Sequence, residues 1–264
     1  MAVIDRPLVH PDRKLSGFRP FKAWRHFRKL IADKEDTEQV FHIIEALKGR
    51  KSYNKALDFV KSDAGQALIQ RGNDLPGMLD DHARWADLPP NSVAQNYIRF
   101  MKREGLSAAG LVEESNKFKP ASERPNDQLE WYFERLRDTH DLFHVLTGYG
   151  RDALGEGCLL GFSYEQNPSP GVLFIAYAGN RELRKATKTK APVLDALREG
   201  RRLGREAAQL AHQEVESLMH EDIDEARARL NLGRPEIYYH CLEILEAEGN
   251  SAQELMAPQQ AQAA

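Results

Sequence analysis

The sequence predicts an all-α fold, a single helical domain of about eight to ten helices with disordered tails. Apolar residues recur at three- and four-residue spacing, and alternating β-branched runs are scarce. Prolines, such as the pair Pro89 and Pro90, fall between the periodic stretches, where helices should begin or end. The helices predicted on this basis cover residues 20–33, 36–48, 53–70, 76–85, 91–104, 126–147, 152–165, 171–184, 191–220 and 223–230.

The two ends of the chain lack this periodicity. Residues 1–17 are rich in Pro, Asp and Arg, and residues 249–264 are poor in bulky apolar side chains. Both segments are therefore predicted to be flexible tails. Residues 18–248 are left to form the helical domain, and a composition of 41% hydrophobic and 29% charged residues is sufficient for one buried core.

The overall charge and the cysteine content exclude several classes of protein. A formal net charge of -3 gives no whole-molecule attraction to nucleic acid, so no nucleic-acid partner is expected. Cys158 and Cys241 are the only cysteines, which excludes a disulfide framework and favours a reducing compartment. Neither a signal or transit peptide nor a continuous apolar run of about 18 residues is evident. We therefore expect a protein of the cytosol that does not span a bilayer.

The most informative segment is residues 126–156. Its apolar stripe places His140 and His144 on the helix face that should be buried, and Asp141 adjoins His144 on the helix surface. Burying two imidazoles and a carboxylate without partners would cost several kcal/mol. A bound metal ion would satisfy all three groups. The alternative is that both histidines are core residues that donate to backbone carbonyls.

A second carboxylate follows in the next predicted helix. Glu156 lies twelve residues beyond His144, and the Thr-Gly-Tyr-Gly segment between them can turn the chain sharply. An antiparallel return would bring Glu156 toward the histidines. Two histidines and two carboxylates suit zinc, while Fe, Mn and Ni are not excluded. The predicted cofactor is thus one divalent metal, zinc first, bound by His140, Asp141, His144 and Glu156.

The spacing His140-Asp141-x-x-His144, followed by Glu156, resembles the signature of the coenzyme Q (ubiquinone) biosynthesis family. Its context is similar as well, both around the motif (residues 135–149) and upstream (residues 88–92 and 97–101). The resemblance extends over roughly residues 20–232. The chain departs from the family at residues 210–214, Leu-Ala-His-Gln-Glu, where a tryptophan usually precedes the glutamate.

The resemblance implies a helical protein, peripheral on the inner membrane, that removes the carboxylate from a polyprenylated 4-hydroxybenzoate intermediate. This carbon–carbon lyase reaction has an oxidative version that leaves a hydroxyl, and the four metal ligands would carry the catalysis. Other ubiquinone biosynthesis enzymes are expected as partners, a homodimer is left open, and the lack of a transit peptide favours the bacterial cytoplasm. The alternative is a non-catalytic, lipid-binding scaffold that organises these enzymes.

Four further features have both a functional and a plain structural explanation. Arg137 could hold the substrate carboxylate or be a surface arginine, and Tyr97 and Phe100 could line a tunnel for the prenyl chain or belong to the core. Residues 20–31 form either an interfacial amphipathic helix or one that packs on the core of the domain. Residues 198–225 are predicted to form one solvated helix, with a partner surface as the alternative.

Overall fold

The computed structural model describes residues 6–13, 17–33, 36–72 and 74–250. Over these residues it contains fifteen α-helices, three short 3-10 helices and no strand beyond an isolated bridge between Ser92 and Asp222. The predicted all-α fold is confirmed, although the helices outnumber the eight to ten expected. Within the described chain, no helix combines the length and apolar composition that crossing a bilayer requires. The helices group into two compact units.

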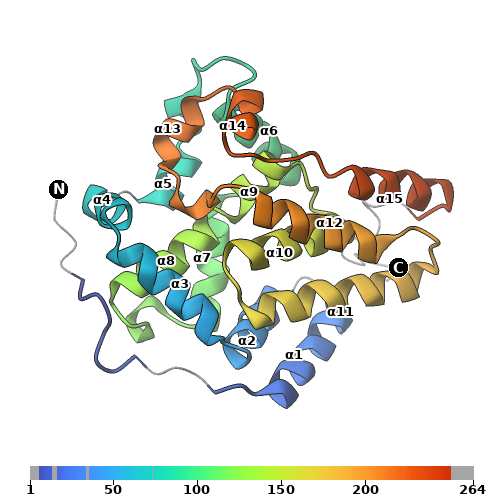
Figure 1. Cartoon of the computed structure of the whole chain (residues 1–264), viewed down its shortest axis with the longest axis horizontal. Coiled ribbons are helices and arrows are strands. Elements are labelled where there is room, and N and C mark those ends of the chain that lie inside the picture. Colours follow the sequence, from blue (N-terminus) through green and yellow to red (C-terminus); the bar gives the residue numbers. More distant parts are fainter. Residues whose placement is uncertain (1–5, 14–16, 34–35, 73, 251–264) are drawn as a thin grey trace, which may run out of the picture. The chain divides into compact units, whose positions relative to one another are not determined.

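The first unit is built from residues 50–146 and 208–232 with part of the N-terminal segment. Trp85, Tyr97 and Tyr132 are fully buried within it. Its helices, seen in Figure 1, are α3 (Arg50–Lys61), α4 (Asp63–Arg71), α5 (Leu75–Asp80), η1 (His82–Trp85), α6 (Val93–Glu104), α7 (Ala108–Phe118), η2 (Ala121–Glu123), α8 (Gln128–Asp138), most of α9 (His140–Thr147), η3 (Leu210–His212), α13 (Val215–His220) and α14 (Ile223–Arg229).

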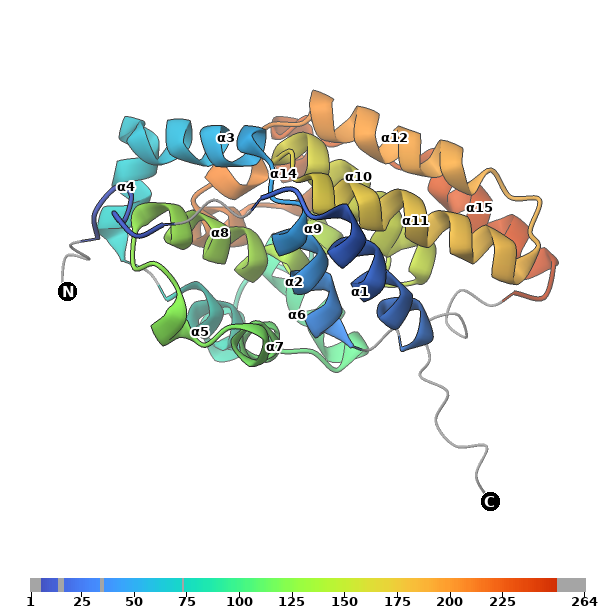
Figure 2. The ribbon, with the colours of Figure 1, turned by 90° about the horizontal axis from the view of Figure 1, so that it is seen from below.

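The second unit is built from the remaining helices, with α10 packed between α11 and α12 and with α1 lying against α2 (Figure 2). Gly200 and Gly204 of α12 allow this close packing. A Cβ atom at Gly204 would lie only 2.4 Å from the carbonyl oxygen of Phe162 in α10. The helices are α1 (Pro20–Ala32), α2 (Thr37–Ala46), α10 (Ala153–Gln166), α11 (Pro170–Thr187), α12 (Val193–Glu206) and α15 (Glu236–Ala247).

Two of the predicted long helices are interrupted by polar side chains. The helix predicted over 126–147 breaks at Thr139, whose hydroxyl donates to the carbonyl of Arg135 at 2.8 Å and so bends the chain between α8 and α9. The helix predicted over 53–70 breaks at Ser62, whose hydroxyl caps α4 by accepting from the backbone N–H of Gly65. The prediction of one helix was wrong in both places.

The predicted helices over 191–220 and 198–225 were also wrong. The backbone turns to an extended conformation at Ala207, where α12 ends. Arg135 is buried and donates to the carbonyl oxygens of Ala211 and Gln213, which holds this segment outside a regular helix. Leu210 and Val215 are buried, so the stretch is not a solvated face.

Two helices were missed, and contacts distant in sequence help to stabilise both. The carboxylate of Asp80 accepts from the backbone N–H groups of Ala108 and Ala109 at the start of α7. The residues of α15 meet the loop before α10, where Tyr238 donates to Asp152 at 2.5 Å and accepts from the backbone N–H of Gly150. Neither contact has a local sequence signature.

Part of the N-terminal segment predicted as a flexible tail has defined contacts. Arg13 forms an ion pair with the buried carboxylate of Asp127 at 2.6 Å, and His10 donates its backbone N–H to the same carboxylate. The guanidinium of Arg13 and these hydrogen bonds outweigh burial and lower the pKa of Asp127. Residues 6–13 are therefore anchored on α8, while residues 1–5, 14–16 and 251–264 lie outside the described residues.

The stability of the first unit is expected to fall as the pH is lowered from about 6.5 to about 4. Burial, with smaller contributions from Lys55 and Arg135, lowers the pKa of His212 to about 4, and its ring stacks on Phe59 with centroids 3.6 Å apart. Because the ring of His212 binds a proton at a higher pH in the unfolded chain than in the folded one, the free energy of unfolding decreases across this pH range. Urea denaturation at several pH values should show this slope reduced in His212→Gln but unchanged in a control, His240→Gln, at an exposed position.

Candidate metal site

The helix α9 carries the three local residues of the predicted metal site. His144 is 1% exposed, Asp141 is 9% exposed and His140 is half-buried. One ligand atom from each of these side chains lies within 4.8 Å of the other two. The structure thus brings the three side chains together, as their spacing on one helix predicts.

Aromatic contacts orient the two imidazole rings. The ring of His144 stacks on Phe100 of α6 with centroids 5.6 Å apart and meets the ring of His140 nearly edge-on at 4.9 Å. Phe100 itself is buried. Packing restricts the ring of His144. The arrangement of His140 and His144 is therefore formed before any ligand binds.

The donor set fits a divalent ion that prefers nitrogen and oxygen. Ligands of one tetrahedral zinc ion, with bonds of about 2.1 Å, lie about 3.5 Å from one another. The atoms of His140, Asp141 and His144 already lie within 4.8 Å, so small side-chain rotations would suffice. In the part of the chain that the structure describes, no other group of three such residues meets this distance.

Tyr97 of α6 lies close to this cluster and is fully buried. Its hydroxyl has no hydrogen-bond partner within the protein. Burial, and to a smaller extent the carboxylates of Asp141 and Asp80, raise the pKa of this hydroxyl, so it remains protonated. A buried donor without a partner is costly, which makes Tyr97 a candidate for contact with a bound molecule.

Two further predicted site residues, Arg137 and Glu156, belong to other helices. Arg137 of α8 is largely buried and forms an ion pair with Asp138 at 2.7 Å, so its guanidinium is already engaged. Glu156 belongs to the second unit, in the first turn of α10, where it is half-buried and lies 3.6 Å from Arg151. The membership of Glu156 in the ligand set, and the contact of Arg137 with substrate, both stay predictions.

One residue that supports the site has no signature in the sequence. Arg227 of α14 donates to the carbonyl oxygens of Leu146 at 3.0 Å and Val145 at 3.1 Å, near the C-terminal end of α9. A cation at this end of a helix satisfies carbonyls that have no partner within the helix. Because 81 residues separate Arg227 from Leu146, only the folded structure identifies this contact.

Replacing Arg227 with alanine is expected to lower the free energy of unfolding of the first unit by about 1–2 kcal/mol, because two charge-assisted hydrogen bonds are lost. Urea denaturation measures this change. Arg229→Ala, at an exposed position of the same helix that pairs with Glu221 on the surface, should cost less than about 1 kcal/mol. Equal losses in the two variants would contradict a special role for Arg227.

Comparison with known proteins agrees with the family resemblance of the sequence. The family model for the coenzyme Q (ubiquinone) biosynthesis protein Coq4 matches residues 54–236. The mitochondrial ubiquinone biosynthesis protein of Penicillium rubens is 27% identical over 150 residues, which are 56% of this chain and 49% of that protein. Its counterpart in Scheffersomyces stipitis is 26% identical over 171 residues, or 64% and 50% of the two chains. This chain thus spans about half the length of the curated relatives it matches.

A solved structure shares the fold. The crystal structure of a candidate ubiquinone biosynthesis protein from Nostoc punctiforme superimposes with a TM-score of 0.59. The match covers 82% of this chain and all of the other, at 21% sequence identity. At this level of identity the similarity concerns the fold alone.

Proposed function

Since the chain belongs to the coenzyme Q (ubiquinone) biosynthesis protein Coq4 family, we propose that it removes the ring carboxylate from a polyprenylated 4-hydroxybenzoate intermediate of that pathway. The observation that carries this proposal is the cluster of His140, Asp141 and His144 on α9, of which Asp141 and His144 are buried. Such a cluster offers a divalent ion three ligands and leaves further coordination positions for Glu156 and for substrate. Zinc is the proposed ion.

The reaction is a decarboxylation. The bond between the ring carbon and the carboxylate breaks, carbon dioxide leaves, and the electron pair on the ring carbon takes up one proton. A divalent metal bound by these residues supplies Lewis-acid stabilisation of the substrate carboxylate or phenolate. In an oxidative version, dioxygen takes up the electron pair and is reduced to hydrogen peroxide, while water supplies the hydroxyl that the ring carbon receives instead of the proton.

The side chains of the site would supply or hold the proton. Asp141 and Glu156 are the carboxyl groups most able to transfer it. The hydroxyl of Tyr97 is protonated and buried near Asp141, so it can donate a hydrogen bond to a substrate oxygen. The buried surroundings of Tyr97 and His144 strengthen such polar interactions by excluding water.

The proposed substrate also sets where the protein acts. A polyprenyl chain is insoluble in water, so we place the reaction at the surface of a membrane, with other ubiquinone biosynthesis enzymes as partners. The two relatives described above are mitochondrial proteins by name. A peripheral position on a bacterial inner membrane, and a homodimer, stay predictions for this chain.

Release of carbon dioxide from the purified protein tests the proposal. The substrate is a prenylated 4-hydroxybenzoate in detergent, labelled at the carboxylate carbon and supplied with and without dioxygen. Wild-type protein and the exposed-site variant His240→Ala should both release label, whereas Asp141→Asn should not. Release only with dioxygen would identify the oxidative version. Bound metal without any release would instead favour the scaffold, in which the metal only joins helices.

Tyr97→Phe separates a functional hydroxyl from a structural one. Because the hydroxyl is buried without a hydrogen-bond partner, its removal should leave the free energy of unfolding unchanged or raise it by up to about 1 kcal/mol. Turnover should nevertheless fall at least about tenfold if the hydroxyl contacts substrate. Tyr132→Phe, at another fully buried tyrosine of the first unit, should keep full turnover. Full turnover in Tyr97→Phe would exclude this role.

A further inference from the structure

The inner face of α1 attaches this helix to the second unit. Ala23 and Phe27 are buried in an apolar cluster formed with residues of α2 and with Ile175 of α11. Leu30 and Ile31 pack partly against the same cluster. Part of the apolar side of α1 is therefore buried in the core of its own unit. This packing holds the helix in a fixed orientation.

The outer face of α1, together with Phe18 just before the helix, is exposed and aromatic. Phe18 is 68% exposed, Phe21 is 90% exposed and Trp24 is 53% exposed. In the part of the chain that the structure describes, these three are the only large hydrophobic side chains with such exposure. Exposed apolar side chains gathered within seven consecutive residues indicate an interaction surface.

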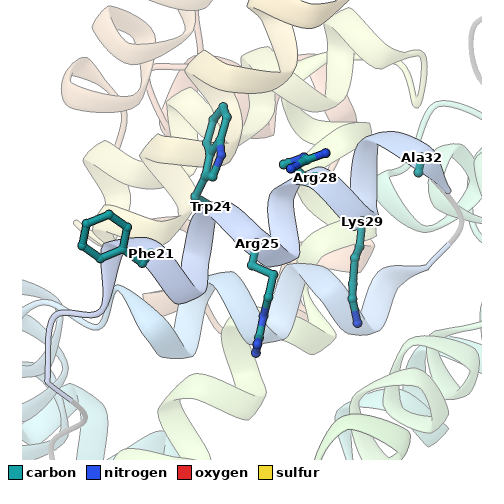
Figure 3. Close-up of a pocket in the computed structure, with 6 residues that line it drawn as sticks. All are labelled: Phe21, Trp24, Arg25, Arg28, Lys29 and Ala32. Carbon is teal, nitrogen blue, oxygen red and sulfur yellow. The ribbon is translucent and has the colours of Figure 1, made fainter.

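Cations lie along the same helix as these aromatic residues. Trp24 and Arg28 extend from one side of α1, whereas Arg25 and Lys29 extend from the opposite side (Figure 3). With Phe21 and Ala32 they line a shallow pocket of about 400 Å³. The sequence of α1 contains no Asp or Glu, although the whole chain carries a net charge of -3. The positive charge is thus a local property of this surface.

This combination of groups matches the interface of an anionic bilayer. Tryptophan and phenylalanine side chains partition into the boundary between headgroups and acyl chains. Arginine and lysine beside them attract anionic phospholipids over about a Debye length. A second copy of this chain fits less well, because two such surfaces would bring like charges together.

We propose that Phe18, Phe21 and Trp24 insert into an anionic phospholipid bilayer while Arg25, Arg28 and Lys29 contact its headgroups. The α1 surface, as we call these six residues, then defines one side of the second unit as the side that faces lipid. This inference deepens the proposed function, because a prenylated substrate lies in the bilayer. It rests, however, on the exposure and charge of α1 and not on the metal cluster.

Binding to lipid vesicles tests the proposal without any substrate. The full chain is mixed with vesicles of phosphatidylcholine alone or of phosphatidylcholine and phosphatidylglycerol in a ratio of about 3:1, and bound protein is measured by flotation. Wild-type protein should bind the anionic vesicles at least about tenfold more tightly than the neutral ones. The double variant Phe21→Ala, Trp24→Ala should lose at least about tenfold in affinity for the anionic vesicles.

A charge-matched control distinguishes binding through the α1 surface from electrostatic attraction between anionic lipid and any exposed cations of the unit. The triple variant Arg25→Ala, Arg28→Ala, Lys29→Ala should lose the preference for anionic vesicles. The triple variant Arg181→Ala, Arg184→Ala, Lys185→Ala removes the same charge from exposed positions of α11 in the same unit and should bind as the wild type does. All of these side chains are exposed, so circular dichroism should show unchanged helix content.

Three results would overturn the proposal: unchanged binding in both α1 variants, equal losses in the α1 and α11 triple variants, or no binding by the wild type. Concentration-dependent self-association that disappears with Phe21→Ala, Trp24→Ala would assign the surface to a second copy instead and would also overturn it. Because vesicle binding requires no turnover, failure of the decarboxylation assay leaves this result unaffected. Conversely, a wild type that fails to bind vesicles but turns over substrate would refute only the role of α1.

Discussion

A His144→Ala variant is expected to bind divalent metal at least about 100-fold more weakly than the wild type and to release no carbon dioxide. The ring of His144 is 1% exposed and lies beside His140 and Asp141, so its removal deletes one ligand from the centre of the cluster. Changes in groups that only support metal ligands already weaken binding about 10–100-fold. Loss of a ligand itself should reach or exceed the upper end of that range.

Calorimetric titration of zinc into chelator-treated protein measures the affinity. Because deletion of a buried ring also disturbs packing, Asp141→Asn provides a second test in which the side-chain volume is nearly unchanged while the charge is lost. The control is His240→Ala, at an exposed position of α15. Wild-type affinity in both cluster variants would mean that α9 does not hold the metal.

Gly204→Ala is expected to lower the free energy of unfolding of the second unit by about 3 kcal/mol or more. A Cβ atom at this position would lie 2.4 Å from the carbonyl oxygen of Phe162 and 2.9 Å from its Cα atom. These are backbone atoms, so α10 and α12 must move apart to admit the methyl group. The higher helix propensity of alanine, worth up to about 1 kcal/mol, offsets only part of this cost.

Gly179→Ala is the matched control for this overpacking. Gly179 also lies within a helix of the second unit, and a Cβ atom there would meet no atom within 4 Å. Its replacement should be neutral or stabilise the unit by up to about 1 kcal/mol. Urea denaturation of both variants measures the two changes. A Gly204→Ala variant as stable as Gly179→Ala would show that the contact between α10 and α12 is not tight.

The sequence predicts the core of the candidate site because that part is local. His140, Asp141 and His144 lie within five residues of one helix, so helical geometry alone places them on neighbouring positions. Glu156 and Arg227 are different, since the position of each depends on how separate helices pack. The role of Arg227 at the end of α9 is visible only in the folded chain.

The fold class follows from periodicity, whereas the helix boundaries depend on individual side chains. Thr139 ends a helix by bonding to the carbonyl of Arg135, and Arg135 in turn holds residues 211–213 outside an α-helix. The start of α7 has a local cap at Ser107, but it is also held by the carboxylate of Asp80, which is 28 residues away in sequence. Such contacts leave no periodic pattern, so the sequence could not reveal them.

For the proposed surface of α1 too, the sequence predicts one part and only the folded structure shows the other. Periodicity identifies an amphipathic helix over residues 20–31 but cannot tell which apolar residues the core uses. The structure assigns Phe27 to the core and leaves Phe21 and Trp24 exposed. The structural explanation, packing on the core, is thus confirmed for Phe27, whereas the interfacial explanation stays a prediction that concerns Phe21 and Trp24.

Anomalous X-ray diffraction from crystals of the metal-loaded protein, measured at the absorption edge of the bound ion, tests the proposed metal site most directly. The proposed site predicts one strong peak per chain, within about 2.0–2.2 Å of ligand atoms of His140, Asp141 and His144, with Glu156 as a further ligand. A peak at another place in the chain, or none at the α9 cluster, would contradict it.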